Sequence, residues 1–356
     1  MSLKSRLEAL IAAEGPITVE AYMALCLHDP AGGYYATRPA LGADGDFITA
    51  PLVSQMFGEL IGLWCAQTWA DMGSPFPVRL VEIGPGDGAL MSDALRALNR
   101  AAPDFIAAAD LWLVETSGPL RGRQSATLAG SGARWADRLE DVPGGAPMIL
   151  IANEFLDCLP ARQFVKDAHG AWAERRVGLG ATGGLAFGLA PPPEGFAAPT
   201  AFADVEPGVV VEMSPAQVGF AASLGARIAR DGGAALLIDY GSAEPEPGDT
   251  LQALRRHEKV DPLATPGEAD LTFHAGFPAV LAAARATGAQ AAILTQGDFL
   301  GRLGIEARAQ TLAAARPDRT EAIARQLHRL THAEEMGELF KAVAIWRDGA
   351  PTPPAF

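Results

Sequence analysis

The sequence predicts an α/β fold: a doubly wound, mostly parallel seven-stranded sheet with a helical N-terminal cover and a C-terminal elaboration. Three observations favour it. From residue 78 onward, short apolar runs alternate with segments of helical length and spacing. The run at 147–153 (PMILIAN) is apolar, as expected for a parallel strand covered on both faces. A glycine-rich turn at 84–88 follows one such run and opens a helix, and this alternation indicates a parallel sheet.

Residues 1–77 are expected to form the helical cover, because this part shows helical spacing and no strand-rich pattern. Thr18 is a candidate cap of its second helix. Segment 29–51 is rich in Gly, Pro and Asp and therefore predicts a long loop. Its glycines suggest a loop that becomes ordered when a ligand binds. The expected helices cover 3–13, 17–27 and 52–71.

Residues 78–356 are expected to form the main domain, in which strands and helices alternate. Two stretches interrupt the alternation. Segment 166–209 predicts a hairpin insertion followed by a Pro/Gly-rich loop, and segment 242–289 predicts a long excursion. The last two expected strands should pair as neighbours in the sheet. The expected strands cover 79–84, 111–115, 133–135, 147–153, 234–241, 290–296 and 340–349.

Composition and charge exclude several classes of protein. The 356 residues carry a net charge of −14, which argues against a general nucleic-acid binder, because phosphate backbones demand clustered Lys and Arg. The three cysteines are too far apart in the sequence to suggest a zinc site or a disulfide framework, so no metal is expected. No apolar run approaches the roughly 20 residues of a membrane span, and the N-terminus lacks a signal-peptide core. A cytoplasmic protein without membrane insertion is therefore expected.

The octapeptide VEIGPGDG (81–88) is the most informative motif. Gly84, Gly86 and Gly88 allow the backbone to turn tightly and to approach a ligand at the strand's carboxyl end. The turn alone is ambiguous, because Gly84-x-Gly86-x-x-Ala89 also satisfies the dinucleotide fingerprint. A nicotinamide-dependent dehydrogenase is therefore a competing interpretation.

Two carboxylates favour an adenosine ligand that carries a methionine moiety. Glu82 lies inside the strand, where dinucleotide sites usually carry an apolar residue, and it is placed to reach an ammonium group. Glu115 ends the second strand, placed to accept hydrogen bonds from ribose hydroxyls. The alternative is that Glu82 caps a helix and Glu115 is solvated. Ser117 and Asn153 are predicted to complete the cofactor site.

The segment NEFLDCLP (153–160) follows the third clear strand, where a transferred group would lie. Its carboxylates suit a cationic acceptor, because charge-assisted hydrogen bonds hold a planar guanidinium in a fixed fork. Glu154 is the predicted catalytic carboxylate, and Asp157 is predicted to assist it. Asp157 and Asn153 could instead cap the following turn. Asp239 and Tyr240, at the end of a later strand, are candidates for the lining of a substrate channel.

The chain resembles a known family in several motifs that occur in the family's order. These are GDFITAP…SQMFGE (45–59), VEIGPGDGAL, ANEFLDCLP, LIDYG, PGEADLTFHAGF and TQGDFL…MGELFK. They are similar to the MidA family of class I methyltransferases, which includes the mitochondrial complex I assembly factor. The resemblance covers nearly the whole chain. It implies a Rossmann-like fold, S-adenosyl-L-methionine as cofactor, and methylation of an arginine in a protein substrate, which in mitochondria is a respiratory complex I subunit.

The family motifs also imply roles for residues of this sequence. Gly84, Gly86 and Gly88 would wrap the cofactor, and Glu115 would hold its ribose. Asp46, Thr49 and Gln55 would close over it. Two departures concern the acceptor contacts, because Leu52 stands where the family has an acidic residue and Gly276 where it has an Asp.

Some alternatives stay open at the level of sequence. A small-molecule methyltransferase would share the cofactor site, and a non-catalytic assembly factor would bind the cofactor for stability alone. The lone histidines His28, His257 and His274 are expected to pack or to form hydrogen bonds rather than to act as bases. The acceptor, the number of methyl groups added and the oligomeric state do not follow from the sequence.

Overall fold

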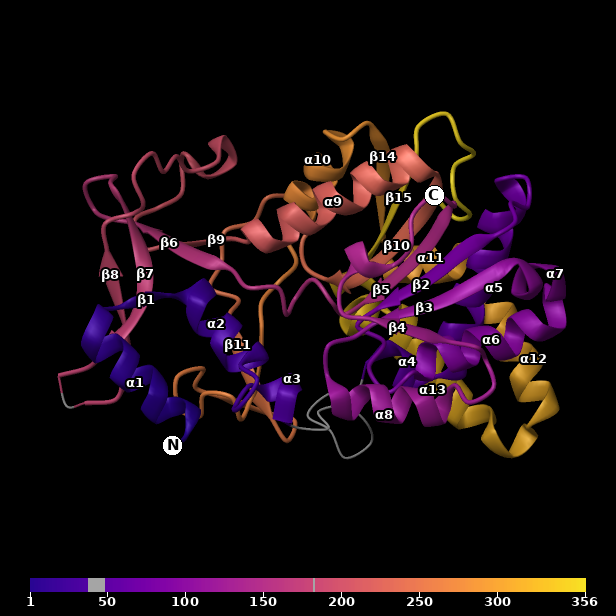
Figure 1. Ribbon diagram of the computed structural model, residues 1–356, viewed down its shortest axis with the longest axis horizontal. Coiled ribbons are helices and arrows are strands. Elements are labelled where there is room, and N and C mark those ends of the chain that lie inside the picture. The colour runs from indigo at the N-terminus through magenta and orange to yellow at the C-terminus, as the bar shows by residue number, and fades with distance from the viewer. Residues whose placement is uncertain (38–48, 182) are drawn as a thin grey trace.

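A computed structural model describes residues 1–37, 49–181 and 183–356 of the chain (Figure 1). Its largest element is a seven-stranded sheet in the order β14-β15-β10-β5-β2-β3-β4. The expected mostly parallel seven-stranded sheet is confirmed, with β15 antiparallel to both of its neighbours. The two last strands pair with each other, as predicted. The strands are β2 (Val78–Ile83), β3 (Ala109–Val114), β4 (Arg134–Ala136), β5 (Met148–Asn153), β10 (Gly233–Tyr240), β14 (Ala289–Thr295) and β15 (Phe340–Arg347).

Both faces of this sheet are buried. Every residue of β5 and of β10 is buried, and successive side chains of a strand point to opposite faces. Ile149 and Ile151 of β5 therefore belong to one hydrophobic cluster, whereas Met148 and Leu150 belong to another. These strands show no alternation of apolar and polar residues because helices cover both faces of the sheet.

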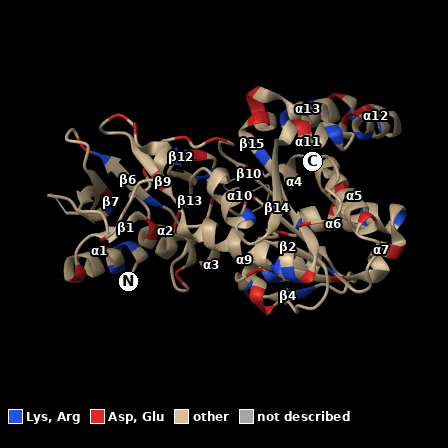
Figure 2. Cartoon of the chain, turned by 90° about the horizontal axis from the view of Figure 1, so that it is seen from above, with Lys and Arg blue, Asp and Glu red and all other residues tan. Residues whose placement is uncertain are grey.

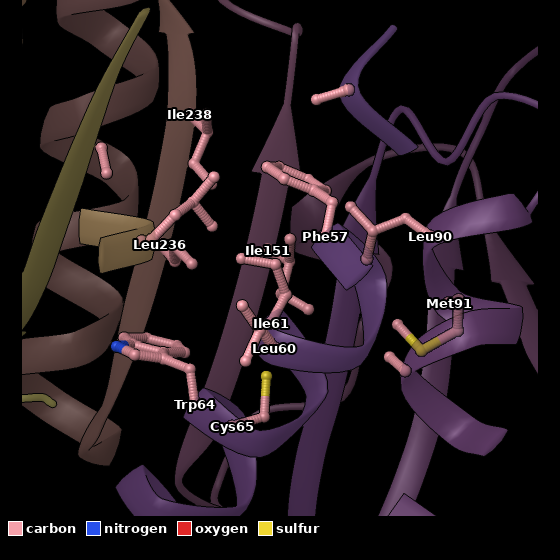
Figure 3. Close-up of a cluster of buried hydrophobic side chains, with 14 of the residues drawn as sticks. Phe57, Leu60, Ile61, Trp64, Cys65, Leu90, Met91, Ile151, Leu236 and Ile238 are labelled. Atoms are coloured by element: carbon pink, nitrogen blue, oxygen red, sulfur yellow. The ribbon is translucent and has the colours of Figure 1, made fainter. Parts of the chain in front are cut away.

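Separate sets of helices cover the two faces. On one face pack α5 (Gln55–Asp71), α6 (Ala89–Ala101), α11 (Gln296–Arg302), α12 (Ile305–Ala315) and α13 (Thr320–Thr331). Figure 3 shows side chains of α5 and α6 meeting those of β5 and β10 in this core. On the other face pack α9 (Pro215–Asp231) and α10 (Phe277–Arg285). The shorter helices α7 (Pro103–Ala108) and α8 (Gly118–Thr127) flank β3.

The outer helices of the first face carry mixed charge. Basic and acidic segments alternate along α12 and α13 (Figure 2). One of these charges anchors α12 to α5, because the guanidinium of Arg308 donates to the carboxylate of Glu59 at 2.7 Å. Arg96 of α6 also donates to Glu59, at 3.0 Å. A single buried carboxylate thus ties three helices together.

A second part of the molecule lies beside the main sheet (Figure 1). It contains a five-stranded sheet in which β6, β7 and β9 run side by side, with β1 and β8 both paired to β7. A three-stranded sheet, β12-β11-β13, and the first three helices share its hydrophobic core. Its helices are α1 (Leu3–Glu14), α2 (Val19–His28) and α3 (Tyr34–Thr37). Its strands are β1 (Ile17–Thr18), β6 (Arg162–Lys166), β7 (Trp172–Leu179), β8 (Leu185–Ala190), β9 (Val210–Met213), β11 (Gln252–Arg255), β12 (Glu258–Val260) and β13 (Asp270–Thr272).

Three local expectations need correction. The predicted helix at 17–27 begins only at Val19, because Ile17 and Thr18 form β1 by pairing with β7. Thr18 is the cap, as predicted, and its hydroxyl accepts from the amide of Ala21 at 3.0 Å. The predicted loop at 29–51 contains α3 and the start of α4 (Ala50–Val53). The predicted hairpin is present as β7 and β8, although it belongs to the five-stranded sheet.

Candidate cofactor and acceptor site

A cavity of about 520 Å³ opens where β2, β3 and β5 end. Its volume lies within the range of pockets that hold small ligands and cofactors. The position follows the rule that ligands of open α/β sheets bind beyond the carboxyl ends of the strands. Walls come from the main sheet, from α4, and from the second part through Tyr35 and Asp270. The cavity therefore lies between the two parts of the molecule.

The glycine turn forms one wall. Gly84, Gly86 and Gly88 have φ values of 63°, 56° and 85°, which side chains rarely adopt and glycine adopts freely. Gly84 and Gly86 line the cavity. Gly88 instead caps the start of α6, and its amide donates to the carbonyl of Pro85 at 2.8 Å. The turn thus presents bare backbone to the cavity and starts a helix directly behind it.

Three buried oxygen atoms of residues that line the cavity have no hydrogen-bond partner among the described residues. They are the hydroxyl of Tyr240 and two acceptors, Oε2 of Glu82 and Oδ1 of Asn153. Burial, with a smaller contribution from the charge of Asp87, raises the pKa of Glu82 to about 8. Buried polar atoms are nearly always paired, so these two acceptors point to a ligand that donates hydrogen bonds.

Glu115 stands across the turn from Glu82 and also lines the cavity. One of its oxygens accepts from the amide of Ser117 at 2.7 Å, and the other accepts from Nε2 of Gln124 at 3.1 Å. Burial raises the pKa of Glu115. Ser117 itself is buried and does not line the cavity, since its hydroxyl caps α8 by accepting from Leu120. Its contribution to the site is made by its backbone.

Glu154 lies next to the glycine turn, on the opposite side from Glu115. It has a φ of 51°, a strained backbone value for a residue other than glycine. One carboxylate oxygen accepts from the amide of Ala50 at 3.1 Å and from Nδ2 of Asn153 at 3.0 Å. Burial, followed by the charge of Asp157, raises the pKa of Glu154 to about 7.

A second carboxylate, Asp157, is buried beside Glu154 and lines the same cavity. Burial raises its pKa to about 6. Asp239 does not line the cavity. It instead holds the turn beneath Glu154, because its carboxylate accepts from the amides of Leu156 at 2.7 Å and of Asp157 at 3.2 Å. The capping role considered for Asp157 therefore belongs to Asp239.

The second part of the molecule contributes residues that the sequence did not single out. Tyr35 of α3 donates its hydroxyl to the carboxylate of Asp270 of β13, at 2.9 Å and 3.1 Å from the two oxygens. Both residues line the cavity, as does Tyr240 of β10 in the main sheet, which the sequence did single out as a candidate lining residue. His28 also lines it and stacks on Tyr35 with 5.9 Å between ring centroids. This end of the cavity is thus acidic and aromatic.

Comparison with known proteins identifies the family of this chain. A family model for S-adenosyl-L-methionine-dependent methyltransferases matches residues 60–295. The chain belongs to this family. The mitochondrial protein arginine methyltransferase NDUFAF7 homolog of Drosophila melanogaster is 36% identical over 97% of this chain and 85% of its own length. The mitochondrial protein arginine methyltransferase NDUFAF7 of Homo sapiens is 34% identical, over 94% of this chain and 81% of its own.

A solved structure agrees with these relatives. The crystal structure of a protein from Burkholderia thailandensis, described as a likely methyl transferase and bound to S-adenosyl-homocysteine, superposes with a TM-score of 0.87 at 31% identity. The superposition covers 99% of this chain and 93% of that chain. The protein is therefore an S-adenosyl-L-methionine-dependent methyltransferase, as the motifs predicted.

The lining of the cavity in this methyltransferase fits that cofactor. The unpaired oxygens of Glu82 and Asn153 could accept hydrogen bonds from an ammonium group, and the turn offers bare backbone beside the cavity. Asp137 and Arg138 follow β4 and line the far end of the cavity. Sequence reasoning missed these two residues, although the strand-end rule that singled out Glu115 applies equally to β4.

The structure gathers most of the predicted site residues of the methyltransferase but not all of them. Thr49 and Leu52 line the cavity. Gln55 does not, since it is exposed and its side chain donates to Glu59 at 3.1 Å. Gly276 caps α10, where its amide donates to Gln217, and is absent from the lining. Asp46 lies outside the described residues.

The described residues of the methyltransferase contain neither a metal-ion site nor a membrane-spanning helix. No group of His, Cys, Asp and Glu side chains in 1–37, 49–181 and 183–356 is arranged to hold a metal ion. Within the same ranges, no helix has the length and apolar character needed to cross a membrane.

Proposed function

We propose that this methyltransferase methylates an arginine side chain of a protein substrate, with Glu154 as the carboxylate that holds and deprotonates the acceptor. One observation carries the proposal. Glu154, Asp157 and Asp270 line the same cavity as the glycine turn, so an acidic surface faces the place where a methyl group is delivered. Such a surface suits a cationic acceptor. The relatives named above as protein arginine methyltransferases support the choice of arginine.

Roles on the cofactor side follow from the lining. Glu82 and Asn153 are proposed to accept from the ammonium group, and Glu115 to accept from the ribose hydroxyls. Gly84 and Gly86 leave room for the ligand beside the backbone. The bound cofactor supplies the methyl group on a sulfonium centre, which is already a good leaving group.

The chain's own residues must make the guanidinium a nucleophile. The Glu154 carboxylate is held in one orientation by the amide of Ala50 and the side chain of Asn153. It can align one guanidinium nitrogen and accept the proton which that nitrogen loses as its new N–C bond forms. A pKa of about 7 suits this task, because a general base works best when its pKa lies near the working pH. Asp157 adds negative charge behind the acceptor.

Glu154→Gln tests this assignment. We expect cofactor binding to stay nearly intact and methyl transfer to fall by about 10²–10⁴-fold, because the amide cannot accept the proton. The wild-type rate should rise with pH through about 7 as Glu154 ionises, and the Glu154→Gln rate should lack this rise. Asp157→Asn should have a smaller effect. Methyl transfer from labelled cofactor to an arginine peptide, with a lysine peptide of the same sequence as control, measures these rates.

A wild-type rate in Glu154→Gln would refute the carboxylate assignment. Transfer to small molecules but to no protein of a lysate would favour the small-molecule alternative, and cofactor binding without any transfer would favour the non-catalytic one. The family resemblance predicts that the acceptor protein is a subunit of a respiratory complex, whereas the cytoplasmic location expected from the sequence stays a proposal. Identification of the labelled protein tests the first point.

A further inference from the structure

The side chain of Gln124 occupies a central position behind the cofactor wall. It lies on α8, is fully buried and does not line the cavity. Its Nε2 donates to the carbonyl of Gly86 at 2.8 Å and to the carboxylate of Glu115 at 3.1 Å. Its Oε1 accepts from the indole of Trp135 at 2.8 Å. The side-chain amide of Gln124 thus connects the glycine turn, the end of β3 and strand β4.

The chemistry of the three partners fixes how this amide is oriented. The indole N–H of Trp135 can only donate, whereas the Gly86 carbonyl and an ionised Glu115 can only accept. A flipped amide would place donor against donor and acceptor against acceptors. Gln124 is therefore held in one orientation, and both of its N–H groups are used.

The consequence for Glu115 is positional. One of its oxygens is held by the amide of Ser117 and the other by Gln124. Each carboxylate oxygen has two acceptor sites, so each keeps one for a ligand hydroxyl. The carboxylate plane is thereby set relative to the glycine turn, because Gln124 contacts both.

We propose that Gln124 is a positioning residue that locks Glu115 and the glycine turn into one rigid cradle for the cofactor's ribose. This inference rests on the proposed assignment of Glu115 to the ribose. It gives Gln124 control over cofactor affinity and over discrimination between ribose and deoxyribose, although Gln124 touches neither the cofactor nor the acceptor.

Binding of S-adenosylhomocysteine and of its 2′-deoxy and 3′-deoxy analogues, measured by calorimetry, tests the inference. In the wild type, loss of a hydroxyl bound to Glu115 should weaken binding about tenfold or more, since hydrogen bonds to charged groups are strong. In Gln124→Met, the Kd of S-adenosylhomocysteine should rise by about fivefold or more, and the deoxyribose penalty should shrink to less than about threefold. A general loss of stability would weaken all three ligands alike and leave the penalty unchanged.

Two variants serve as controls. Gln296→Met removes an equally buried amide, which donates to the carbonyl of Leu330 and does not line the cavity, and it should leave all three affinities unchanged. Trp135→Phe removes only the indole that donates to Gln124. It should decrease the deoxyribose penalty, but by less than Gln124→Met does. If Gln124→Met fails to fold, Trp135→Phe decides the question.

Glu115→Gln separates this inference from the ribose assignment on which it rests. A penalty that vanishes in Glu115→Gln but persists in Gln124→Met and Trp135→Phe would refute the positioning role alone. A penalty that persists in Glu115→Gln would overturn the ribose assignment and the positioning role together. Wild-type affinity and discrimination in folded Gln124→Met would likewise refute the inference.

Discussion

At the scale of single residues, the site depends on carboxyl groups whose burial favours the protonated form. Glu82 is the clearest case, because it is 2% exposed and its pKa is raised to about 8. A buried acid that meets a bound ammonium group must ionise, since opposite charges at short range favour the charged form. Cofactor binding should therefore be linked to the loss of a proton from Glu82.

This linkage predicts a pH dependence of affinity. Below about pH 8 the free enzyme holds the Glu82 proton and must release it on binding, so the affinity for S-adenosylhomocysteine should rise by up to about tenfold per pH unit between pH 6 and 8. Above pH 8 it should level off. Calorimetry in two buffers of different ionisation enthalpy should detect the released proton. The Glu82→Gln variant should bind S-adenosylhomocysteine more weakly than the wild type and should release fewer protons on binding. Equal proton release by the wild type and Glu82→Gln would assign the proton to another group, such as Glu154.

The sequence could reveal only those site residues that carry a local signal. Glu82 and Gly84 stand in one octapeptide, and their relation to the ligand follows from strand, turn and helix. Tyr35 and Asp270 are 235 positions apart and meet only through tertiary packing. Gln124 lies mid-helix in a segment without a motif, so nothing in its neighbourhood indicates three buried hydrogen bonds.

At the scale of elements, the close contact of α5 with α6 supports the glycine turn, because α6 begins at Gly88. Gly58 and Gly62 lie on the contact face of α5. A Cβ at Gly62 would lie 2.9 Å from the backbone of Ala94 and 3.1 Å from its Cβ, and one at Gly58 would lie 2.7 Å from Asp93. The helices approach so closely only because these positions lack side chains.

Gly62→Ala should therefore destabilise the fold, although alanine favours helix by about 1 kcal/mol. Overpacking against backbone typically costs about 1–3 kcal/mol, so we expect a net loss in the free energy of unfolding, measured by denaturant titration. Gly301→Ala on α11 is the matched control, since its Cβ would meet nothing within 4 Å, and it should be neutral or slightly stabilising. Equal stability of the two variants would show that α5 can move away from α6 without cost.

Six strands of the main sheet could be predicted from sequence because they are largely apolar runs of six to eight residues, whereas β4 has only three. The pairing of β14 with β15 was also predicted, since they are the last two strands in chain order. The five-stranded sheet was not, because β1 has only two residues and exists through its pairing of Ile17 with Val177. A strand of two residues has no periodicity of its own, and its partner β7 lies in a segment for which the sequence predicts only a hairpin insertion.

At the scale of the whole molecule, the cavity joins two parts that have separate hydrophobic cores. Glu82 and Glu115 stand on the main sheet, whereas Tyr35 and Asp270 belong to the second part. The division of the chain into a cover of 1–77 and a main domain stays a prediction from the sequence. Because the ligand binds the folded state alone, its binding should stabilise the whole molecule against unfolding.

This stabilisation also separates the two cofactor classes that the glycine turn alone leaves open. At a concentration of 100 times its Kd, S-adenosylhomocysteine should add about 2.7 kcal/mol to the free energy of unfolding and raise Tm by about 3–4 °C. A nicotinamide dinucleotide at the same concentration should leave Tm unchanged. Glu154→Gln should keep the full shift, because its carboxylate is assigned to the acceptor, and Glu82→Gln should show a smaller shift, because it loses the charge proposed to face the ammonium group. A shift caused by the dinucleotide would contradict the cofactor class. A shift lost in Glu154→Gln but kept in Glu82→Gln would reverse the assignment of the two ends of the cavity.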